Sequence, residues 1–95
     1  ARGNSLALTV TPLPSGLADD VPELADGGVV IDQLREGPAR AAGLASGDVI
    51  VTLNHQQIQN VEDFSRVVES LPATGYVPVR VVRNGRGTTL VLELR

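Results

Sequence analysis

The sequence is poor in the residues that much of protein chemistry depends on. Its 95 residues include no cysteine, methionine, tryptophan or lysine, and only one histidine, one tyrosine and one phenylalanine. Without cysteine the chain can form no disulfide, no cysteine-ligated zinc site and no thiol nucleophile. A single histidine cannot supply a metal site that needs two. We therefore expect no cofactor.

Long apolar runs and an excess of positive charge are missing as well. No run approaches the roughly 18 apolar residues that a membrane-spanning helix needs, so we expect no direct membrane insertion. The formal net charge of −3 disfavours nucleic acid as a partner. The chain begins without methionine and without a signal-peptide pattern. We interpret residues 1–95 as a single domain excised from a larger protein.

The pattern of the remaining residues predicts a small α+β domain. Apolar residues make up 42% of the chain and aromatic residues only 2%, so the core is built from aliphatic side chains, which favours strands. Alternating or continuous apolar runs predict strands at 5–13, 29–34, 48–54, 76–83 and 88–94. A short helix is expected at 39–42, after Pro38 and before Gly43.

Two local signals are the clearest. Asn60 is a good N-cap, and the apolar residues that follow recur with helical spacing, at Val61, Phe64, Val68 and Leu71. They predict a long amphipathic helix that ends before Pro72. Asn84-Gly85 between two apolar runs predicts a β-hairpin. Pro78 suggests that the strand containing it lies at an edge of the sheet or at a strand start.

No enzyme motif is complete. In Gly43–Gly47 (GLASG) the serine stands one place too late for the nucleophile motif G-x-S-x-G, and a strand follows where a helix is needed. The same segment lacks the lysine of a phosphate-binding loop, and Asp48 after it is expected to accept hydrogen bonds from backbone N–H groups. His55 is interpreted as an exposed loop residue. The acidic residues lack calcium-loop spacing, so we expect a non-catalytic domain.

The segment Gly37–Ile50 then finds an explanation. Its pattern G-P-A-x-x-A-G-L-x-x-G-D-V-I, followed by a polar link and an amphipathic helix, resembles the PDZ domains of bacterial envelope proteases. The matching residues are Pro38, Ala39, Ala42, Gly43, Leu44, Gly47, Asp48 and Ile50. The resemblance extends over residues 5–94 and is greatest to the second, C-terminal PDZ domain of HtrA/DegP-type periplasmic serine proteases. It implies a PDZ-like fold of about five strands in a partly open barrel or sandwich, with one long and one short helix.

The resemblance also implies a site. PDZ domains bind an extended peptide, usually a C-terminus, as an added strand between an edge strand and the long helix. Backbone N–H groups before the strand hold the peptide carboxylate. The residues to which this role transfers are Ser5, Leu6, Ala7, Leu8, Thr9, Val10, Val61, Phe64, Ser65 and Val68. Ala7 stands where the family has glycine, and the pattern assigns Phe64 either to the core or to the pocket.

The function implied is that of a peptide-binding module in the periplasm. It would bind the hydrophobic C-terminal tails of misfolded envelope proteins, and it would regulate or deliver substrate to an attached serine protease in envelope protein quality control. One alternative is a contact with its own protease domain or a neighbouring PDZ domain during oligomer assembly, with weak or no binding of free peptide; Ala7 favours this alternative. Another is a scaffold domain of a secretion system.

Overall fold

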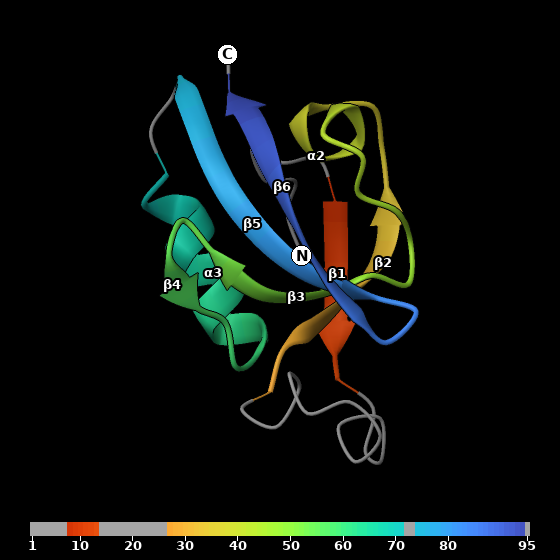
Figure 1. Cartoon of the computed structure of the whole chain (residues 1–95). Helices are drawn as coiled ribbons and strands as arrows, with labels where there is room; N and C mark the ends of the chain where they lie inside the picture. Colours follow the sequence, from red (N-terminus) through yellow and green to blue (C-terminus); the bar gives the residue numbers. More distant parts are fainter. Residues whose placement is uncertain (1–7, 14–26, 72–73, 95) are drawn as a thin grey trace.

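The protein is described from a computed structural model, which places residues 8–13, 27–71 and 74–94. The strands are β1 (Leu8–Pro12), β2 (Val29–Leu34), β3 (Val49–Leu53), β4 (Gln56–Gln57), β5 (Gly75–Arg83) and β6 (Arg86–Leu94), and the helices are α2 (Pro38–Ala41) and α3 (Val61–Glu69). Figure 1 shows them in chain order. The predicted α+β class is confirmed, and the sixth strand is the two-residue β4 in the polar link.

The strands form one antiparallel sheet that does not close on itself. The order is β1-β2-β3-β5-β6, and β4 pairs with β3 beside this path. The two ends of the order, β1 and β6, are therefore edge strands among the described residues. Both helices and one face of the sheet enclose the main core, which is aliphatic apart from Phe64. A smaller cluster of Val49, Val51 and Val82 covers the other face of the sheet. Burial of β3 on both faces confirms what its continuous apolar run predicts.

The start of α3 is fixed by side-chain hydrogen bonds. Oδ1 of Asn60 accepts a hydrogen bond from the backbone N–H of Asp63 at 2.8 Å. Oδ2 of Asp63 accepts one in return from the N–H of Gln59 at 3.2 Å. This reciprocal arrangement satisfies two backbone donors at the N-terminus of the helix. The predicted cap is confirmed, and the helix ends at Glu69, before Pro72.

The turn that carries the PDZ-like pattern has a structural role. α2 begins at Pro38 and is followed by Gly43, which has a φ of 101°. Gly47 has a φ of 93°, and its N–H donates to the carbonyl of Ile31 at 2.8 Å. The N–H of Ile31 donates in turn to the carbonyl of Asp48 at 2.8 Å. Two residues thus oppose one, which is the geometry of a glycine bulge, and the chain enters β3 through it.

Asp48 joins this turn to the final hairpin. Asp48 is 3% exposed, and its side chain accepts a hydrogen bond from the N–H of Ala45 at 3.0 Å, as the sequence predicts. The guanidinium of Arg83 binds it in a bidentate manner, at 2.9 and 2.6 Å, and also donates to the carbonyl of Gly43 at 2.7 Å. The hydrogen bond to Asp48 and its charge raise the pKa of Arg83. Because stability from a raised pKa is lost only as the pH rises through it, Arg83 adds no pH dependence near neutrality.

The hairpin of β5 and β6 is continuous over its whole length. Asn84 and Gly85 form its turn with φ of 54° and 79°, as a two-residue turn of type I′ requires. The expectation for Pro78 is wrong in part, because β5 lies between β3 and β6 and Pro78 is its fourth residue. Pairing with β3 begins only at Val79, and the carbonyl of Pro78 accepts from Asn54 at 2.9 Å. The nitrogen of Pro78, which carries no hydrogen, thus points toward the residue after the end of β3. No hydrogen bond between β3 and β5 is lost there.

Candidate functional site at the β1 edge

The open side of β1 is where the sequence predicts the site. β1 pairs with β2, in which Ile31 lies opposite Val10. Both backbone groups of Ile31 bond to Gly47 and Asp48, on the side away from β1. In an antiparallel pair, the backbone N–H and C=O groups of two opposite residues either point toward each other or both point away from the partner strand. The N–H and C=O of Val10 therefore point away from β2, toward the open edge.

Two features shorten this edge. The register shifts between Thr9 and Val10, so Asp32 of β2 is an extra residue that pairs with no residue of β1. Such a bulge bends and twists the pair. Pro12 follows Val10 by two residues, so its nitrogen also points outward and offers no N–H. The backbone available for an added strand is consequently short and centred on Val10.

The side chains assigned to the site from β1 and α3 lie in one hydrophobic cluster. β1 and α3 are in contact. Of the predicted residues, the cluster contains Leu8, Val10, Val61, Phe64 and Val68. Leu8, Phe64 and Val68 are buried, whereas Val10 and Val61 are only partly buried. The structure thus assigns Phe64 to the core and leaves Val10 and Val61 as the partly exposed apolar side chains among the predicted residues.

The remaining predicted residues divide into three groups. Ser65 is exposed on α3. Thr9 is on the opposite face of β1 from Leu8 and Val10, because side chains alternate along a strand. Ser5, Leu6 and Ala7 lie outside the described residues, so the carboxylate-binding role assigned to them stays a prediction.

Thr9 carries a stability cost that a substitution can remove. Its Oγ1 atom is buried and has no hydrogen-bond partner among the described residues. Replacement by the isosteric valine, Thr9→Val, is expected to raise the free energy of unfolding by about 1 kcal/mol, because a buried hydroxyl without a partner is unfavourable. Urea denaturation followed by circular dichroism measures it. Thr11→Val, at an exposed position near the end of β1, is the control, with a change within about 0.5 kcal/mol. A destabilised Thr9→Val variant would contradict the assignment.

The described residues offer little for metal binding. Within them no three histidine, cysteine or acidic side chains gather into a possible metal site. His55 is exposed in the turn between β3 and β4, with a φ of 66°, which confirms it as a loop residue. No helix in residues 8–13, 27–71 and 74–94 is long and apolar enough to cross a membrane.

Comparisons with known proteins agree with this geometry. The sequence pattern of the PDZ domain family matches residues 15–94. A probable periplasmic serine endoprotease, DegP-like, from Pseudomonas fulva is 44% identical over 68 residues, which are 72% of this chain and 14% of that protein. The protein of the same description from Hahella chejuensis is 40% identical over the same shares. The chain thus matches about one seventh of the length of these relatives, whose names give a periplasmic location that extends to it by resemblance.

Solved structures resemble the fold over nearly the whole chain. A variant of the HtrA-type protease AlgW with a decapeptide has a TM-score of 0.82 and 29% identity, covering 95% of this chain and 28% of that chain. The HtrA3 PDZ domain bound to a phage-derived ligand has a TM-score of 0.75 and 16% identity, covering 95% and 83%. The second of these shows the fold alone. The chain therefore belongs to the PDZ domain family, and its relatives are DegP-like periplasmic serine endoproteases of the HtrA type.

Proposed function

We propose that this domain binds the hydrophobic C-terminus of a protein as an added strand along β1. The observation that carries the proposal is the outward direction of the Val10 N–H and C=O, next to the partly buried valines of β1 and α3. An extended peptide satisfies such backbone groups with its own and gains affinity from main-chain hydrogen bonds. Its terminal side chain then packs on Val10 and Val61, above the floor formed by Leu8, Phe64 and Val68.

The size and chemistry of this surface favour a small aliphatic terminal residue. Leu8, Phe64 and Val68 are themselves buried, so the apolar surface left for the peptide is that of the partly buried Val10 and Val61. The side chains of Val10 and Val61 are aliphatic and partly buried, which favours an apolar side chain on the peptide. The carboxylate is expected to reach the backbone of Ser5–Ala7. The related protease AlgW is described with a decapeptide and with a tripeptide, which supports a peptide as the ligand.

The affinity is expected to be weak. The edge is short, few side chains anchor the peptide, and the peptide loses conformational freedom when it binds. We expect a Kd on the order of micromolar, which corresponds to about −8 kcal/mol. Weak binding suits a module that captures many different tails and releases them.

The activity of the whole protein belongs to the same proposal. The relatives are named serine endoproteases, and this chain covers 14% of their length. The domain itself would be non-catalytic and would regulate an attached protease or deliver to it the tails of misfolded envelope proteins. Exposed hydrophobic C-termini mark such proteins, since folding normally buries apolar side chains.

An amide NMR titration with short peptides ending in valine, leucine, phenylalanine or alanine tests the proposal. Shift changes should cluster at residues 5–10 and along Val61–Glu69, and C-terminal amidation should abolish them. Val61→Asp, at the first position of α3 where an acidic residue suits the helix dipole, should weaken binding about tenfold or more. Glu62→Ala on the exposed neighbour is the control. Absence of shifts at millimolar peptide would overturn peptide binding and leave the assembly role.

A further inference from the structure

The second edge strand, β6, lacks the protection that the first one has. β6 is nine residues long and pairs with β5 without any register shift. It contains no proline and its pairing has no bulge, whereas β1 contains Pro12 and pairs with β2 through a bulge at Asp32. Soluble proteins usually blunt a long edge strand with such devices, because its unpaired backbone groups attract another strand. In the part of the chain that the structure describes, no strand pairs with the outer side of β6.

The direction of the backbone groups on β6 follows from the hairpin. A two-residue turn makes Arg83 and Arg86 a hydrogen-bonded pair, and the pairs alternate from there along the ladder. The N–H and C=O groups that point outward are therefore those of the odd-numbered residues Gly87, Thr89, Val91 and Glu93. Leu92 and Leu94 are buried in the core, so the odd-numbered side chains lie on the outer face of the sheet.

This outer face carries the two exposed large hydrophobic side chains that the described residues contain. Val91 is 52% exposed and Tyr76 is 73% exposed. Pro78 lies directly opposite Val91 in the ladder, and Tyr76 lies opposite Glu93. Tyr76, Pro78 and Val91 thus form an apolar patch on the outer face, and Glu93 lies beside it. An apolar patch along an unprotected strand edge indicates a surface for another strand.

We propose that β6 pairs antiparallel with β6 of a second copy of this chain, with Val91 opposite Val91 of the second copy. The two-fold symmetry of such a pair is isologous, so each contact occurs twice. In this register the outward groups of Val91 bond to each other, and Thr89 of one copy lies opposite Glu93 of the other. The exposed Val91 side chains meet at the centre, flanked on both sides by Pro78.

The charges select this register. Nη1 of Arg80 donates to Oγ1 of Thr89 at 3.3 Å, so the guanidinium lies over Thr89 on the outer face. When Thr89 of the second copy lies opposite Glu93, Arg80 of the second copy comes within reach of the carboxylate. Symmetry gives two such ion pairs around the central valines. A two-fold axis at Leu90 instead would set Glu93 opposite Gly87, away from Arg80.

The contacts that these side chains make within their own chain do not prevent the pairing. Arg80 and Glu93 each have a further interaction within the described structure, and a guanidinium or a carboxylate can hold several hydrogen bonds at once. The interface of one strand pair is small, so the dimer is expected to be weak, with a Kd on the order of 100 micromolar. β6 is at the opposite end of the strand order from β1. Dimerisation and peptide binding therefore use different edges.

Charge exchange tests the proposal. Sedimentation equilibrium of the 95-residue chain should show a monomer–dimer equilibrium, and amide shifts should move at β6 as concentration rises. Arg80→Glu or Glu93→Arg alone should weaken the dimer about tenfold or more, because like charges then face each other twice. The double variant Arg80→Glu with Glu93→Arg should restore it.

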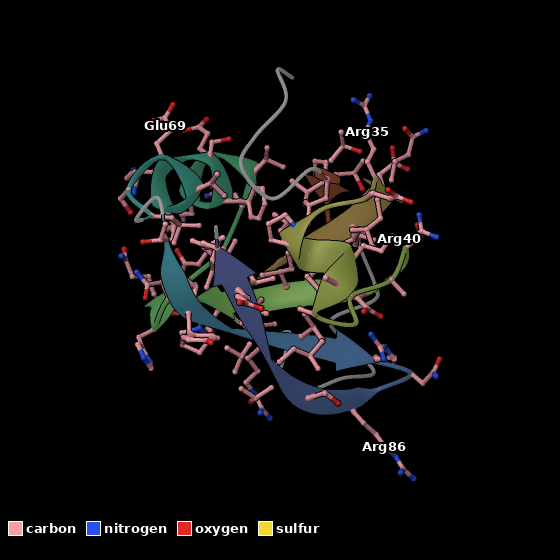
Figure 2. The ribbon with its side chains drawn as sticks, turned by 90° about the horizontal axis from the view of Figure 1, so that it is seen from above. Arg35, Arg40, Glu69 and Arg86 are labelled. Atoms are coloured by element: carbon pink, nitrogen blue, oxygen red, sulfur yellow. The ribbon has the colours of Figure 1, made fainter. Side chains whose placement is uncertain are left out.

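Arg86→Glu is the matched control for Arg80→Glu, since both make the same change in net charge. Arg86 extends from the tip of the hairpin, away from the rest of the molecule (Figure 2). Its substitution should therefore leave the dimer unchanged. A chain that stays monomeric at millimolar concentration, or a double variant no better than the single ones, would overturn the proposal. Peptide shifts at β1 should be the same in all variants, so failure of this inference is separate from failure of the proposed function.

Discussion

Phe64→Ala is expected to lower the free energy of unfolding by about 3–4 kcal/mol. Phe64 is the one phenylalanine of the chain and is 3% exposed. It projects from α3 into a cluster of aliphatic side chains that come from both helices and from β1, β2, β3, β5 and β6. Most of those side chains are on strands of the sheet, which limits their collapse into the cavity. A domain of this size has a total stability of only about 5–10 kcal/mol, so the loss is a large part of it.

Chemical denaturation followed by circular dichroism measures this loss. Phe64→Leu keeps most of the volume and should cost less than about 1.5 kcal/mol. Tyr76→Ala removes the other aromatic ring, which is 73% exposed, and should change stability by no more than about 0.5 kcal/mol. If Phe64→Ala cost no more than Tyr76→Ala, Phe64 would not be a core residue, and its assignment to the peptide pocket would return.

Elements with strong local signals could be predicted from the sequence. Asn60 followed by acidic residues and helical apolar spacing locates α3, because capping is decided within four residues of the chain. Asn84-Gly85 locates the hairpin, because few residues accept positive φ. α3 begins at Val61, directly after the predicted cap, and the two strands of the hairpin begin within two residues of their predicted starts. Local chemistry therefore determines these elements before any tertiary contact is known.

Contacts between distant residues could not be predicted. Asp48 was expected to accept from nearby backbone N–H groups, which it does, but its ion pair with Arg83 spans 35 residues. Nothing near Arg83 distinguishes it from Arg80 or Arg86, and only the folded hairpin brings it to the turn. The position of Pro78 in a central strand could not be predicted for the same reason, because Pro78 is tolerated there only where β3 ends.

The candidate site shows the same division. The resemblance to PDZ domains implies that Leu8 and Val10 face Val61, Phe64 and Val68, and these side chains do lie in one cluster. The sequence could not show which of them would be buried, because burial depends on how closely α3 approaches the sheet. The outward direction of the Val10 backbone and the bulge at Asp32 depend on strand register, which is set by pairing with β2.

Gly27 controls how closely the start of β2 approaches the segment before α3. It has a φ of +101°, and a Cβ added there would lie 2.6 Å from the carbonyl oxygen of Gln59 and 3.2 Å from its Cα. Those atoms are backbone and cannot rotate aside. The neighbouring N–H of Gly28 donates to the same carbonyl at 3.3 Å, so a displaced Gln59 loses this bond as well. We expect Gly27→Ala to cost about 3 kcal/mol, from backbone strain together with the clash.

Gly43→Ala separates these two contributions. Gly43 has the same φ of +101°, but a Cβ there meets nothing within 4 Å. It should therefore cost only the strain of a left-handed residue, about 1 kcal/mol. The excess of Gly27→Ala over Gly43→Ala, measured by chemical denaturation, reports the close approach to Gln59. Equal costs would mean that the segment before α3 can yield.

Gly27→Ala should also affect the peptide site. Gln59 directly precedes the Asn60 cap, and its N–H donates to Oδ2 of Asp63 in the first turn of α3. Moving Gln59 therefore moves the start of the helix, where Val61 is the predicted contact for the peptide. We expect Gly27→Ala to shift the amide signals of Gln59–Asp63 and to weaken peptide binding, whereas Gly43→Ala should leave both unchanged. Unchanged binding in a folded Gly27→Ala domain would mean that the peptide does not depend on the N-terminal turn of α3.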